Sequence, residues 1–582
     1  MGAVMLAHKR KPTRFGGFFY VFLLCLLSVQ AWGAIYFIHG DTGDDLNDGS
    51  SALAPKRTYG SITVSAGDYF YIKGGTTLEE QLSITADSIT ITNWPTDTAG
   101  AQNFATGDAS YDTSGKWIID CENTRQFGIY GRAISSLTMM DGEIKNCTEN
   151  AVHVTADTAA TTESNIAHVR LIAHDIGPGI ASPSGETQYH IGTCFFARTA
   201  YPTVTGTAVL DGVTYTDTVA YNCGKHGYDT RWRVLNVRHV RALAYNSGLT
   251  ATGHGFSIHP LFETFSSSGW TNPSSTIYCR DRSSNSNQER RVVESSANVI
   301  LTQNTATPQT PASGEWGVVS QGGGGVCDGS DTVGFLYVNV GSVLTGKSFI
   351  VKRFPHGPFW YVDSVAHNNV DALSQAEGHG FSADDLSGPA YYINSYAYDN
   401  AGDGFKTLRG ESIVWRGDIS NSNDDSGFAI TNCTNCEFTN NTANANGTRG
   451  FWDIGITSVN VDITNNLATN DVLRGFSMSA GTVAASGYSD ADNNSYGNVN
   501  NGCSGVVNCA TSDPSYLGGA SPTSAAGFCL EPDSALLDAG TYIGAYIYGY
   551  GGESLPNPSP IGARGLCNTR RAAATRRAAT RN

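Results

Sequence analysis

The sequence predicts an all-β fold, a right-handed parallel β-helix in which short strands stack coil upon coil. A Gly-Phe pair recurs five times between residues 366 and 480 at intervals of 24, 23, 23 and 25 residues; its phenylalanines are Phe381, Phe405, Phe428, Phe451 and Phe476. An asparagine stands five residues before three of them, at Asn400, Asn423 and Asn446. This period is too short for helical repeats and lacks the leucines of leucine-rich repeats. We expect coils about 4.8 Å apart, with phenylalanines stacked inside and asparagine amides forming a ladder in a turn.

The composition agrees with this fold class. The 582 residues include 67 glycines, and only 15% of the residues are charged, while 10% are aromatic. Low charge combined with abundant turn-forming residues is typical of an all-β solenoid rather than of a helical enzyme.

The two ends of the chain are expected to lie outside the fold. Residues 1–33 have a basic start, an apolar run from Phe15 to Val29, and the small residues Ala31 and Gly33 at the −3 and −1 positions of a cleavage site. A membrane anchor is the alternative, but the run is short for a span, so we predict a signal peptide, export from the cytoplasm and no stable span after cleavage. Residues 567–582 read as a disordered basic tail.

The charge distribution limits the partners. The formal charge is −16, but the leader and the tail carry four and five Lys or Arg residues with no Asp or Glu, so the body between them has a charge of −25. Such a body repels nucleic acid, which we exclude as a partner. An anionic polysaccharide would need a bridging cation or a local basic patch.

Cysteine usage suits an exported protein. Of the 13 cysteines, Cys25 lies in the leader, and the remaining twelve are an even number, which favours disulfides. The predicted local pairs are Cys433 with Cys436, Cys503 with Cys509, and Cys279 with Cys327. The Cys-x-x-Cys at 433–436 is also compatible with a redox or zinc site, but no second pair stands at ligand spacing.

Residues 34–60 are expected to cap the N-terminal end of the coil. The stretch from Gly43 to Ser51, followed by Pro55 and Thr58, resembles the N-terminal segment of secreted bacterial β-helix proteins of the pectate-lyase-like superfamily. Such a segment hides the open end of a solenoid. Oxygen-bearing residues alternate in it, so it forms either a calcium site or a self-capped turn; the candidate ligands are Asp45, Asn47 and Asp48.

The remaining chain divides into two runs of coils, an insertion and a C-terminal cap. We predict coils over 61–270 and 361–510, an inserted β module over 271–360 and a cap over 511–566. Gly314-Glu315-Trp316 and the apolar run at 335–340 resemble a small β-sandwich inserted in several bacterial β-helix glycoside hydrolases, and the segment 530–545 resembles the C-terminal segment of the same superfamily. An insertion between coils can wall one side of a groove.

Outward-facing rows of side chains locate the predicted groove. If each repeat phenylalanine points inward, residues one and three places later point outward to solvent. The first row reads Asp229, Ser257, Ser382, Lys406, Ala429, Trp452 and Ser477, and the second reads Arg231, His259, Asp384, Leu408, Thr431 and Ile454. Charged side chains and histidine concentrate in the coils from 229 to 409, next to the insertion, which predicts a functional site there.

The residue types allow two reactions on a polysaccharide. The candidate catalytic residues are Asp384, Asp385, Lys406, Arg409 and His259, and the candidate substrate-binding residues are Asp229, Arg231, Asp403 and Trp452. Hydrolysis needs two carboxylates about 5 to 9.5 Å apart, which coils at about 4.8 Å supply when Asp384 or Asp385 is combined with Asp403 or Asp425. A lyase needs a base for the C5 proton of a uronate, such as Lys406, Arg409 or His259, and a cation for its carboxylate.

Structural roles for the same residues stay open. Asp384 and Asp385 would then be solvated strand ends, to which Lys406 and Arg409 pair across coils. Both His254 and His379 precede a Gly-Phe pair, which favours a shared role in the turn over catalysis.

The combined prediction is a secreted β-helix enzyme acting on extracellular polysaccharide, as a glycoside hydrolase or a polysaccharide lyase. The superfamily resemblance contributes to this expectation, and fold alone does not fix function. A uronate C5-epimerase would use the same groove. The competing class is a non-catalytic glycan-binding, adhesive or tail-spike-like protein; calcium is the one cofactor considered.

Overall fold

A computed structural model describes the coil-forming part of the chain. The described ranges are 33–100, 112–156, 162–177, 192–199, 208–250 without 232, 253–259, and 357–478 without 373–376, 385, 387–388, 409, 411, 432 and 454–457. Between 260 and 356 only the backbone of eight strands is described, and beyond 478 the description covers short stretches up to residue 536.

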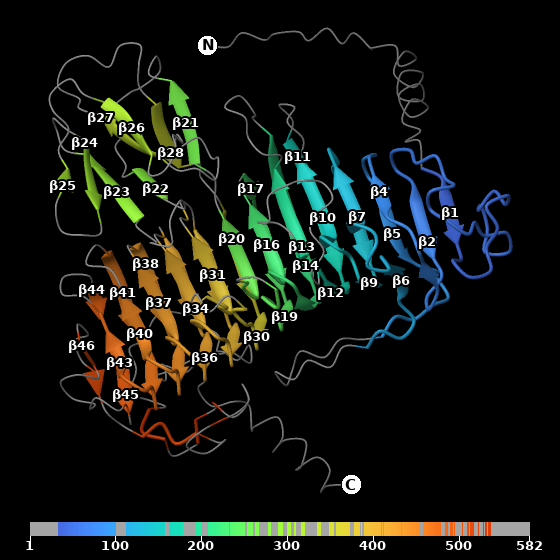
Figure 1. Cartoon of the computed structure of the whole chain (residues 1–582). Coiled ribbons are helices and arrows are strands. Elements are labelled where there is room, and N and C mark those ends of the chain that lie inside the picture. The colour runs from blue at the N-terminus through green and yellow to red at the C-terminus, as the bar shows by residue number, and fades with distance from the viewer. Residues whose placement is uncertain are drawn as a thin grey trace, which may run out of the picture.

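Three long sheets of parallel strands make up the body (Figure 1). Sheet A contains β1 (Ile35–Ile38), β2 (Tyr69–Ile72), β5 (Thr90–Asn93), β8 (Thr138–Met140), β11 (Thr162–Val169), β14 (Val209–Thr216), β18 (Val237–Val240), β29 (Phe359–Val362), β32 (Ala390–Ile393), β35 (Ile413–Arg416), β38 (Thr434–Thr439), β41 (Val459–Thr464) and β44 (Val483–Ser486), with β17 (Val234–Leu235) beside β14.

Sheet B contains β3 (Thr77–Leu78), β6 (Trp117–Asp120), β9 (Gly142–Lys145), β12 (Ile172–Ile176), β15 (Val219–Cys223), β19 (Leu243–Tyr245), β30 (Val365–His367), β33 (Tyr396–Tyr398), β36 (Ile419–Asn421), β39 (Thr442–Asn444), β42 (Leu467–Thr469), β45 (Ser489–Asp492) and β47 (Cys509–Ala510). Sheet C contains β4 (Leu82–Ile84), β7 (Phe127–Arg132), β10 (Asn150–Ala156), β13 (Thr193–Thr199), β16 (Tyr228–Arg231), β20 (Phe256–His259), β31 (Phe381–Asp384), β34 (Phe405–Leu408), β37 (Phe428–Thr431), β40 (Arg449–Asp453), β43 (Arg474–Ser477) and β46 (Cys503–Ser504).

From β29 to β46, successive strands along the chain lie in sheets A, B and C in turn, and each strand pairs with its equivalent one coil later. In the second run of coils, β32, β33 and β34 lie in sheets A, B and C, and β35, β36 and β37 repeat that order beside them. The described residues contain no α-helix. The all-β parallel β-helix predicted from the Gly-Phe repeat is therefore confirmed.

The repeat phenylalanines form one continuous stack in the interior. Phe405 and Phe428 pair in register, and their rings stack at 4.9 Å between centroids with planes 3° apart. The same geometry runs through every Gly-Phe coil, and each phenylalanine is at most 1% exposed. Each buried ring contributes about 1.5–3 kcal/mol to folding, so this one position holds the coils in register.

A second aromatic stack from sheet A fills the rest of the interior, and the sequence analysis did not identify it. Its members are Tyr215, His239, Tyr361, Tyr392, Trp415 and Phe438. Their rings meet the sheet C phenylalanines edge to face, as Tyr361 meets Phe381 at 5.6 Å and 78°. Offset-stacked and edge-to-face contacts are the two arrangements that aromatic rings favour.

The predicted asparagine ladder is present and longer than expected. The Nδ2 of Asn400 donates to the Oδ1 of Asn423 at 2.8 Å, and Asn423 donates in the same way to Asn446 at 3.0 Å. Asn369 joins one end of the ladder, and Asp471 occupies the next place at the other. These buried amides satisfy one another from coil to coil, as buried polar groups must.

Two corners with left-handed backbone flank each of the sheet B strands β30, β33, β36, β39 and β42. Asn394 precedes β33 with φ of 53° and Asp399 follows it with φ of 52°. In the next coil Gly417 takes the first corner at 71°. Asparagine, aspartate and glycine tolerate this conformation best, which explains why these residue types recur between the strands.

The insertion lies between adjacent coils. β20 pairs directly with β31 although more than a hundred residues separate them in the chain. Between them are eight antiparallel strands, β21 (Phe262–Ser266), β22 (Ile277–Arg280), β23 (Glu289–Glu294), β24 (Val299–Gln303), β25 (Pro308–Gln309), β26 (Trp316–Ser320), β27 (Gly334–Val338) and β28 (Phe349–Arg353). Figure 1 draws them as a separate group beside the coils; the sandwich and the boundaries 271–360 stay predictions.

Three disulfides connect described cysteines. Cys433–Cys436 was predicted, whereas Cys121–Cys147 and Cys194–Cys223 join neighbouring coils and were missed, because their partners are more than 25 residues apart. The side chains of the predicted pairs 503–509 and 279–327 lie outside the described residues.

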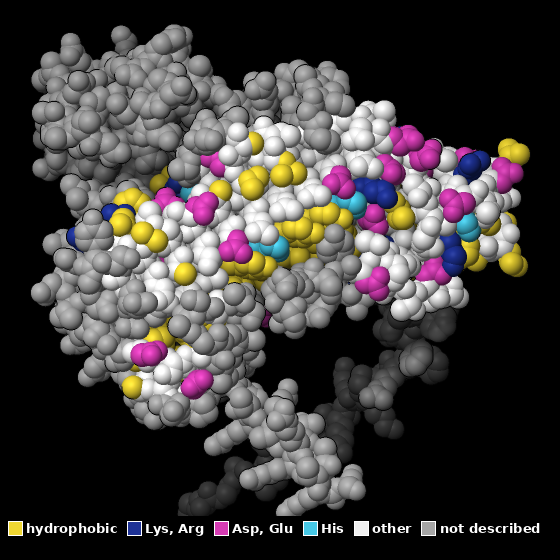
Figure 2. Space-filling view, turned by 60° about the horizontal axis from the view of Figure 1, so that its bottom comes forward, with side chains coloured by type: hydrophobic (Ala, Val, Ile, Leu, Met, Phe, Trp, Pro, Cys, Tyr) yellow, Lys and Arg dark blue, Asp and Glu magenta, His cyan; other side chains and the backbone are white. Residues whose placement is uncertain are grey.

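The outer face of sheet B carries an aromatic row of its own. His174, Tyr221, Tyr245, His367 and Tyr398 stack on one another at 4.6–5.0 Å. Figure 2 turns this underside of the coil forward and shows hydrophobic side chains and histidines along it. Phe528, near the C-terminus, packs against Tyr396 beside this row. No helix among the described residues is long and apolar enough to cross a membrane.

Candidate active site

The predicted outward row on sheet C has the predicted register. Asp229 pairs with Ser257, Ser257 with Ser382 and Ser382 with Lys406. The row continues through Ala429 and Trp452. Residues that are distant in sequence therefore lie side by side on one face, as the site prediction requires.

The expectation that this whole row faces solvent is wrong for several members. Asp229, Arg231 and Ser257 are at most 5% exposed, although they lie on the outer face of the sheet. Neighbouring side chains cover them, since Arg231 lies over the Phe196 ring with 5.9 Å between its Cζ and the ring centroid. Lys406 and Trp452, by contrast, are half-buried.

A row of histidines begins three consecutive sheet C strands. His226, His254 and His379 each stand two residues before an inward-facing ring, and their rings follow one another at 5.1 and 5.0 Å. Each Nδ1 accepts a backbone N–H from the next coil: that of His254 at 3.1 Å, that of His379 at 3.3 Å and that of Asp403 at 2.8 Å. The shared turn role expected for His254 and His379 is thus present.

These bonds fix the proton position on each ring. A nitrogen that accepts an N–H carries no hydrogen, so in the neutral imidazole the hydrogen is on Nε2. Burial, with further contributions from Lys406 and His254, lowers the pKa of His379 well below its usual value, so its ring is neutral at pH 7. Each Nε2–H therefore acts as a donor directed away from the backbone.

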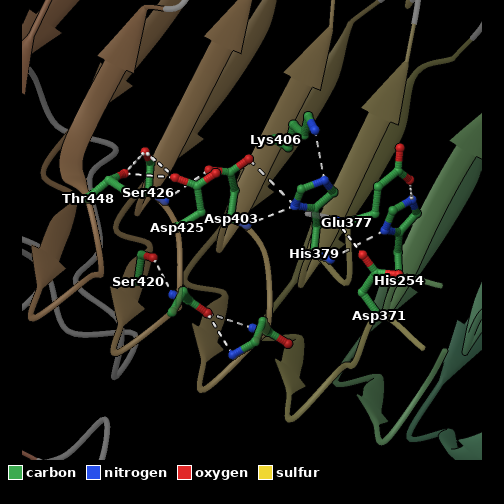
Figure 3. Close-up of polar contacts among 12 residues, drawn as sticks. His254, Asp371, Glu377, His379, Asp403, Lys406, Ser420, Asp425, Ser426 and Thr448 are labelled. Carbon is green, nitrogen blue, oxygen red and sulfur yellow. Dashed lines mark hydrogen bonds and ion pairs between the residues drawn. The ribbon is translucent and has the colours of Figure 1, made fainter. Parts of the chain in front are cut away.

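Lys406 lies in hydrogen-bond contact with His379. Its Nζ lies 2.9 Å from Nε2 of His379, and Figure 3 shows the two side chains pointing at each other from adjacent strands. The direction of this hydrogen bond depends on the tautomer of the ring. The tautomer that lets Nδ1 accept the N–H of Asp403 carries its hydrogen on Nε2, which then faces Nζ of Lys406.

Asp403 occupies the next place in the histidine row. It is 2% exposed, and its Oδ1 accepts the N–H of Ser426 at 3.0 Å. Burial raises the pKa of Asp403 to about 7; Asp425 acts in the same direction, whereas Lys406 and the Ser426 N–H oppose the shift. Asp425 accepts the hydroxyl of Thr448 at 2.8 Å. Asp403 can therefore exist as an acid near neutral pH.

A second carboxylate approaches the row from the irregular segment that precedes β31. Glu377 Oε2 lies 3.4 Å from Nε2 of His254, and the Glu377 side chain is 25% exposed. Its backbone N–H donates to Asp371 at 3.1 Å. Neither acidic residue was identified from the sequence, because both precede the Gly-Phe pair in an irregular turn.

Asp229, Arg231 and His259 form a separate cluster three coils from Lys406. Arg231 Nε donates to Asp229 Oδ2 at 2.6 Å, and His259 Nε2 lies 2.8 Å from the hydroxyl of Ser257 and 4.0 Å from Asp229 Oδ1. The site prediction placed these residues together with Lys406. The structure separates them by two to three coil spacings along the outer face of sheet C.

The composition of this cluster suggests a metal, but its hydrogen bonds do not. His226, Asp229 and His259 offer ligand atoms within 4.8 Å of one another. For Nε2 of His226 to bind a metal, its hydrogen would have to move to Nδ1, which instead accepts the N–H of His254. Arg231 already neutralises Asp229. These residues do not fit a divalent cation.

The remaining predicted site residues are only partly described. Asp384 ends β31 opposite Leu408, but its side chain, like Asp385 and Arg409, lies outside the described residues. Their catalytic roles stay predictions. A sugar that stacks on Trp452 would share the indole ring with Arg449, because the Cζ of Arg449 lies 4.2 Å from the ring centroid.

The N-terminal loop holds itself together. Asp45 Oδ1 accepts the N–H groups of Arg57 and Thr58, and Asp48 Oδ1 accepts that of Ser50. Asn47 Nδ2 donates to the carbonyl of Pro55. This is the self-capped alternative; the calcium role of the three residues stays a prediction.

A shallow cavity of about 550 Å³ lies away from this chemistry, on the outer face of sheet A. It is lined by hydroxyl and amide side chains and ends at Trp360, over which Arg238 lies at 5.1 Å. Arg231, Arg238 and Arg241 lie close together in the sequence but do not form one basic patch. Arg238 faces outward from sheet A and Arg241 pairs with Asp217, whereas Arg231 lies on sheet C.

Comparison with known proteins gives similar structures only. No family model matches the chain, and no curated protein matches it. Pectate lyase Pel9A is 14% identical over 92% of this chain and 96% of its own, with a TM-score of 0.43. GH136 lacto-N-biosidase from Eubacterium ramulus is 10% identical over 78% of this chain and 66% of its own, with a TM-score of 0.40. The A-module of Azotobacter vinelandii mannuronan C-5 epimerase AlgE4 is 9% identical over 82% of this chain and 85% of its own, with a TM-score of 0.27.

Proposed function

We propose that this protein is an extracellular polysaccharide-processing enzyme, a lyase that removes the C5 proton of a uronic acid unit, with Lys406 as the base. The observation that carries the proposal is the 2.9 Å contact between the Lys406 amine and Nε2 of His379. A base must be unprotonated and partly accessible. Lys406 is half-buried on the outer face of sheet C, and we assign its amine the acceptor role toward Nε2–H of His379.

The elimination can be followed bond by bond. The lone pair of Lys406 takes the C5 proton, the C–H electrons form the C4=C5 double bond, and the bond from C4 to the glycosidic oxygen breaks. The resulting Lys406 ammonium can return a proton to the departing oxygen. A cation must neutralise the uronate carboxylate for the C5 proton to become acidic; we assign that role to Arg409, which follows β34 directly. An epimerase would share the first step.

Hydrolysis is the second candidate, and Asp403 supports it. A general acid works best with a pKa near the operating pH, and burial gives Asp403 a pKa of about 7. Asp384, Asp385 or Asp425 would then be the second carboxylate. Asp403 is only 2% exposed, which argues against its direct contact with a sugar. We therefore rank elimination above hydrolysis.

A product assay separates the classes. Purified protein is incubated with a panel of uronic acid polymers and of neutral polysaccharides, with and without calcium. Ultraviolet absorbance from unsaturated ends identifies a lyase, whereas new reducing ends without that absorbance identify a hydrolase. An intact polymer with an inverted C5 identifies an epimerase, and an intact, unchanged polymer that stays bound identifies the adhesive class.

Export from the cytoplasm belongs to the same proposal. The basic and apolar leader, the disulfides and the acidic body support it. Expression of the full-length chain followed by N-terminal sequencing of the mature protein would test cleavage after residue 33.

A further inference from the structure

Two arginines continue the row in which the histidines stand. Arg449 and Arg474 are two residues before Phe451 and Phe476, as His379 is before Phe381, and they pair in register on β40 and β43. Both lie on the same side of the coil as Asp403 and Ser426. The tripeptide Arg-Gly-Phe occurs at both places in the sequence.

Their pairing differs from that of other arginines. Arg170, Arg241 and Arg416 each bind a carboxylate at 2.6–2.7 Å. Among the described residues no carboxylate oxygen lies within ion-pair distance of Arg449 or Arg474, although the body carries a large excess of acidic groups. Surface arginines normally find partners in such a field. These two instead face each other across one coil spacing, where like charges repel.

Burial makes this pair costly without a ligand. Arg449 is half-buried, and its Nε is a buried donor that makes no hydrogen bond. Burial, followed by the charge of Arg474, lowers the pKa of Arg449, whereas Asp425 acts in the opposite direction. Asp425 Oδ1 is already occupied by the hydroxyls of Thr448 and Ser426. A buried donor of this kind indicates a site that an acceptor fills.

An aromatic ring completes the group. Arg449 lies over Trp452, whose neighbours along the outward row are the small residues Ala429 and Ser477. Guanidinium groups bind carboxylates and sulfates in a planar, paired geometry, and indole rings bind sugar faces.

We propose that Arg449, Arg474 and Trp452 form a subsite for an anionic group, a carboxylate or a sulfate ester, of an acidic polysaccharide. The subsite is two coils, about 10 Å, from Lys406 along the groove, so it would hold a sugar unit flanking the one that reacts. This inference deepens the proposed function and rests on it for the position of the reacting unit. It supplies the local basic patch that an acidic body needs.

The test measures binding in the Lys406→Ala background, where turnover is absent. Polygalacturonate and its fully methyl-esterified form share one backbone and differ in whether the carboxylate is charged or esterified. Dextran sulfate and dextran extend the comparison to sulfate esters. We expect Arg449→Gln with Arg474→Gln to weaken binding of the acidic polymers at least about tenfold at low salt and to leave the neutral polymers unchanged. The polymer that shows the loss identifies the anion.

Control variants keep the outcome clear. Arg241→Gln removes an arginine of the opposite side that pairs with Asp217, and it should not change binding. Arg449→Lys with Arg474→Lys keeps the charge, so this double variant should bind the acidic polymers more tightly than the glutamine pair does. The lysine pair keeps the test informative if the glutamine pair folds poorly. Equal binding of an acidic polymer by the parent and by the glutamine pair would overturn the subsite. Lost binding in that pair with no turnover by wild-type protein would keep the subsite and overturn the proposed function.

Discussion

The amine of Lys406 lies 2.9 Å from Nε2 of His379, and Nδ1 of the same ring accepts the backbone N–H of Asp403 at 2.8 Å. A backbone amide of one coil thereby determines which ring nitrogen of the preceding coil faces the lysine. The stacking of coils, rather than a loop, holds the candidate base in place. Sites on regular elements are held more precisely than sites on loops.

Replacement of His379 should slow the reaction. In His379→Asn the Lys406 amine loses the ring nitrogen that lies 2.9 Å from it, so kcat/KM should fall about 10- to 100-fold with little change in Tm. His367→Asn, in the aromatic row of sheet B, is the matched control and should keep the wild-type rate. An unchanged kcat/KM in His379→Asn would mean that the ring does not act on Lys406.

Asp403 separates the two proposed reactions. Burial raises its pKa in the folded state to about 7, well above that of an exposed aspartate. The folded state therefore holds a proton that the unfolded state releases between about pH 4 and 7, and stability falls as pH rises through that range. Asp403→Asn should therefore raise the Tm at pH 8 relative to wild type, with little change at pH 4. Under elimination the variant keeps turnover; under hydrolysis it loses it.

The asparagine ladder contains a built-in weakness at Asp471. Asn446 Nδ2 donates to Asp471 Oδ1 at 2.9 Å, but Asp471 Oδ2 is buried with no hydrogen-bond partner. An asparagine there would donate to Asn494 as its equivalents do in earlier coils. We expect Asp471→Asn to stabilise the protein by about 1–3 kcal/mol.

The pH dependence of that gain follows from burial, which raises the pKa of Asp471 to about 8. The wild-type carboxyl is protonated in the folded state up to about pH 8 and ionised in the unfolded state above about pH 4. The free energy of unfolding of the wild-type protein therefore falls as pH rises from about 4 to 8. The advantage of Asp471→Asn in chemical denaturation should thus be greatest above pH 8 and least near pH 4. A gain that does not vary with pH would contradict the shift.

The interior phenylalanine stack should be the main determinant of stability. Phe405→Ala removes a ring that stacks on Phe381 and Phe428, and we expect a loss of about 3–5 kcal/mol. Phe405→Leu keeps most of the volume and should cost less. Denaturant unfolding of both variants checks this order. Equal stability of Phe405→Ala and wild type would mean that the stack contributes little.

Much of the fold followed from local periodicity. The spacing of the Gly-Phe pairs predicted the stacked coils. The alternation of inward and outward side chains along each strand predicted the row that runs from Asp229 to Lys406. The second aromatic stack escaped, because Tyr215, His239 and Trp415 are chemically different residues at equivalent positions. The disulfide between Cys121 and Cys147 escaped for a related reason, since it joins coils and not nearby residues.

The candidate site was predictable in its place and less so in its contacts. Pairing of Lys406 with Asp384 or Asp385 was one alternative and stays untested, because those side chains lie outside the described residues. The described partner of Lys406 is His379, which stands in a turn outside the strand pattern. Arg449 and Arg474 were missed although both precede a Gly-Phe pair. The position two residues before each phenylalanine, compared coil by coil, would have revealed the whole row.

The most direct test of the account is the rate at which unsaturated ends form from uronic acid polymers, measured by ultraviolet absorbance for wild type and Lys406→Ala. The account predicts absorbance with at least one polymer of the panel, and a loss of about 10²- to 10⁴-fold in the variant with the Tm unchanged. Wild-type rates in Lys406→Ala, or new reducing ends without any absorbance, would contradict it.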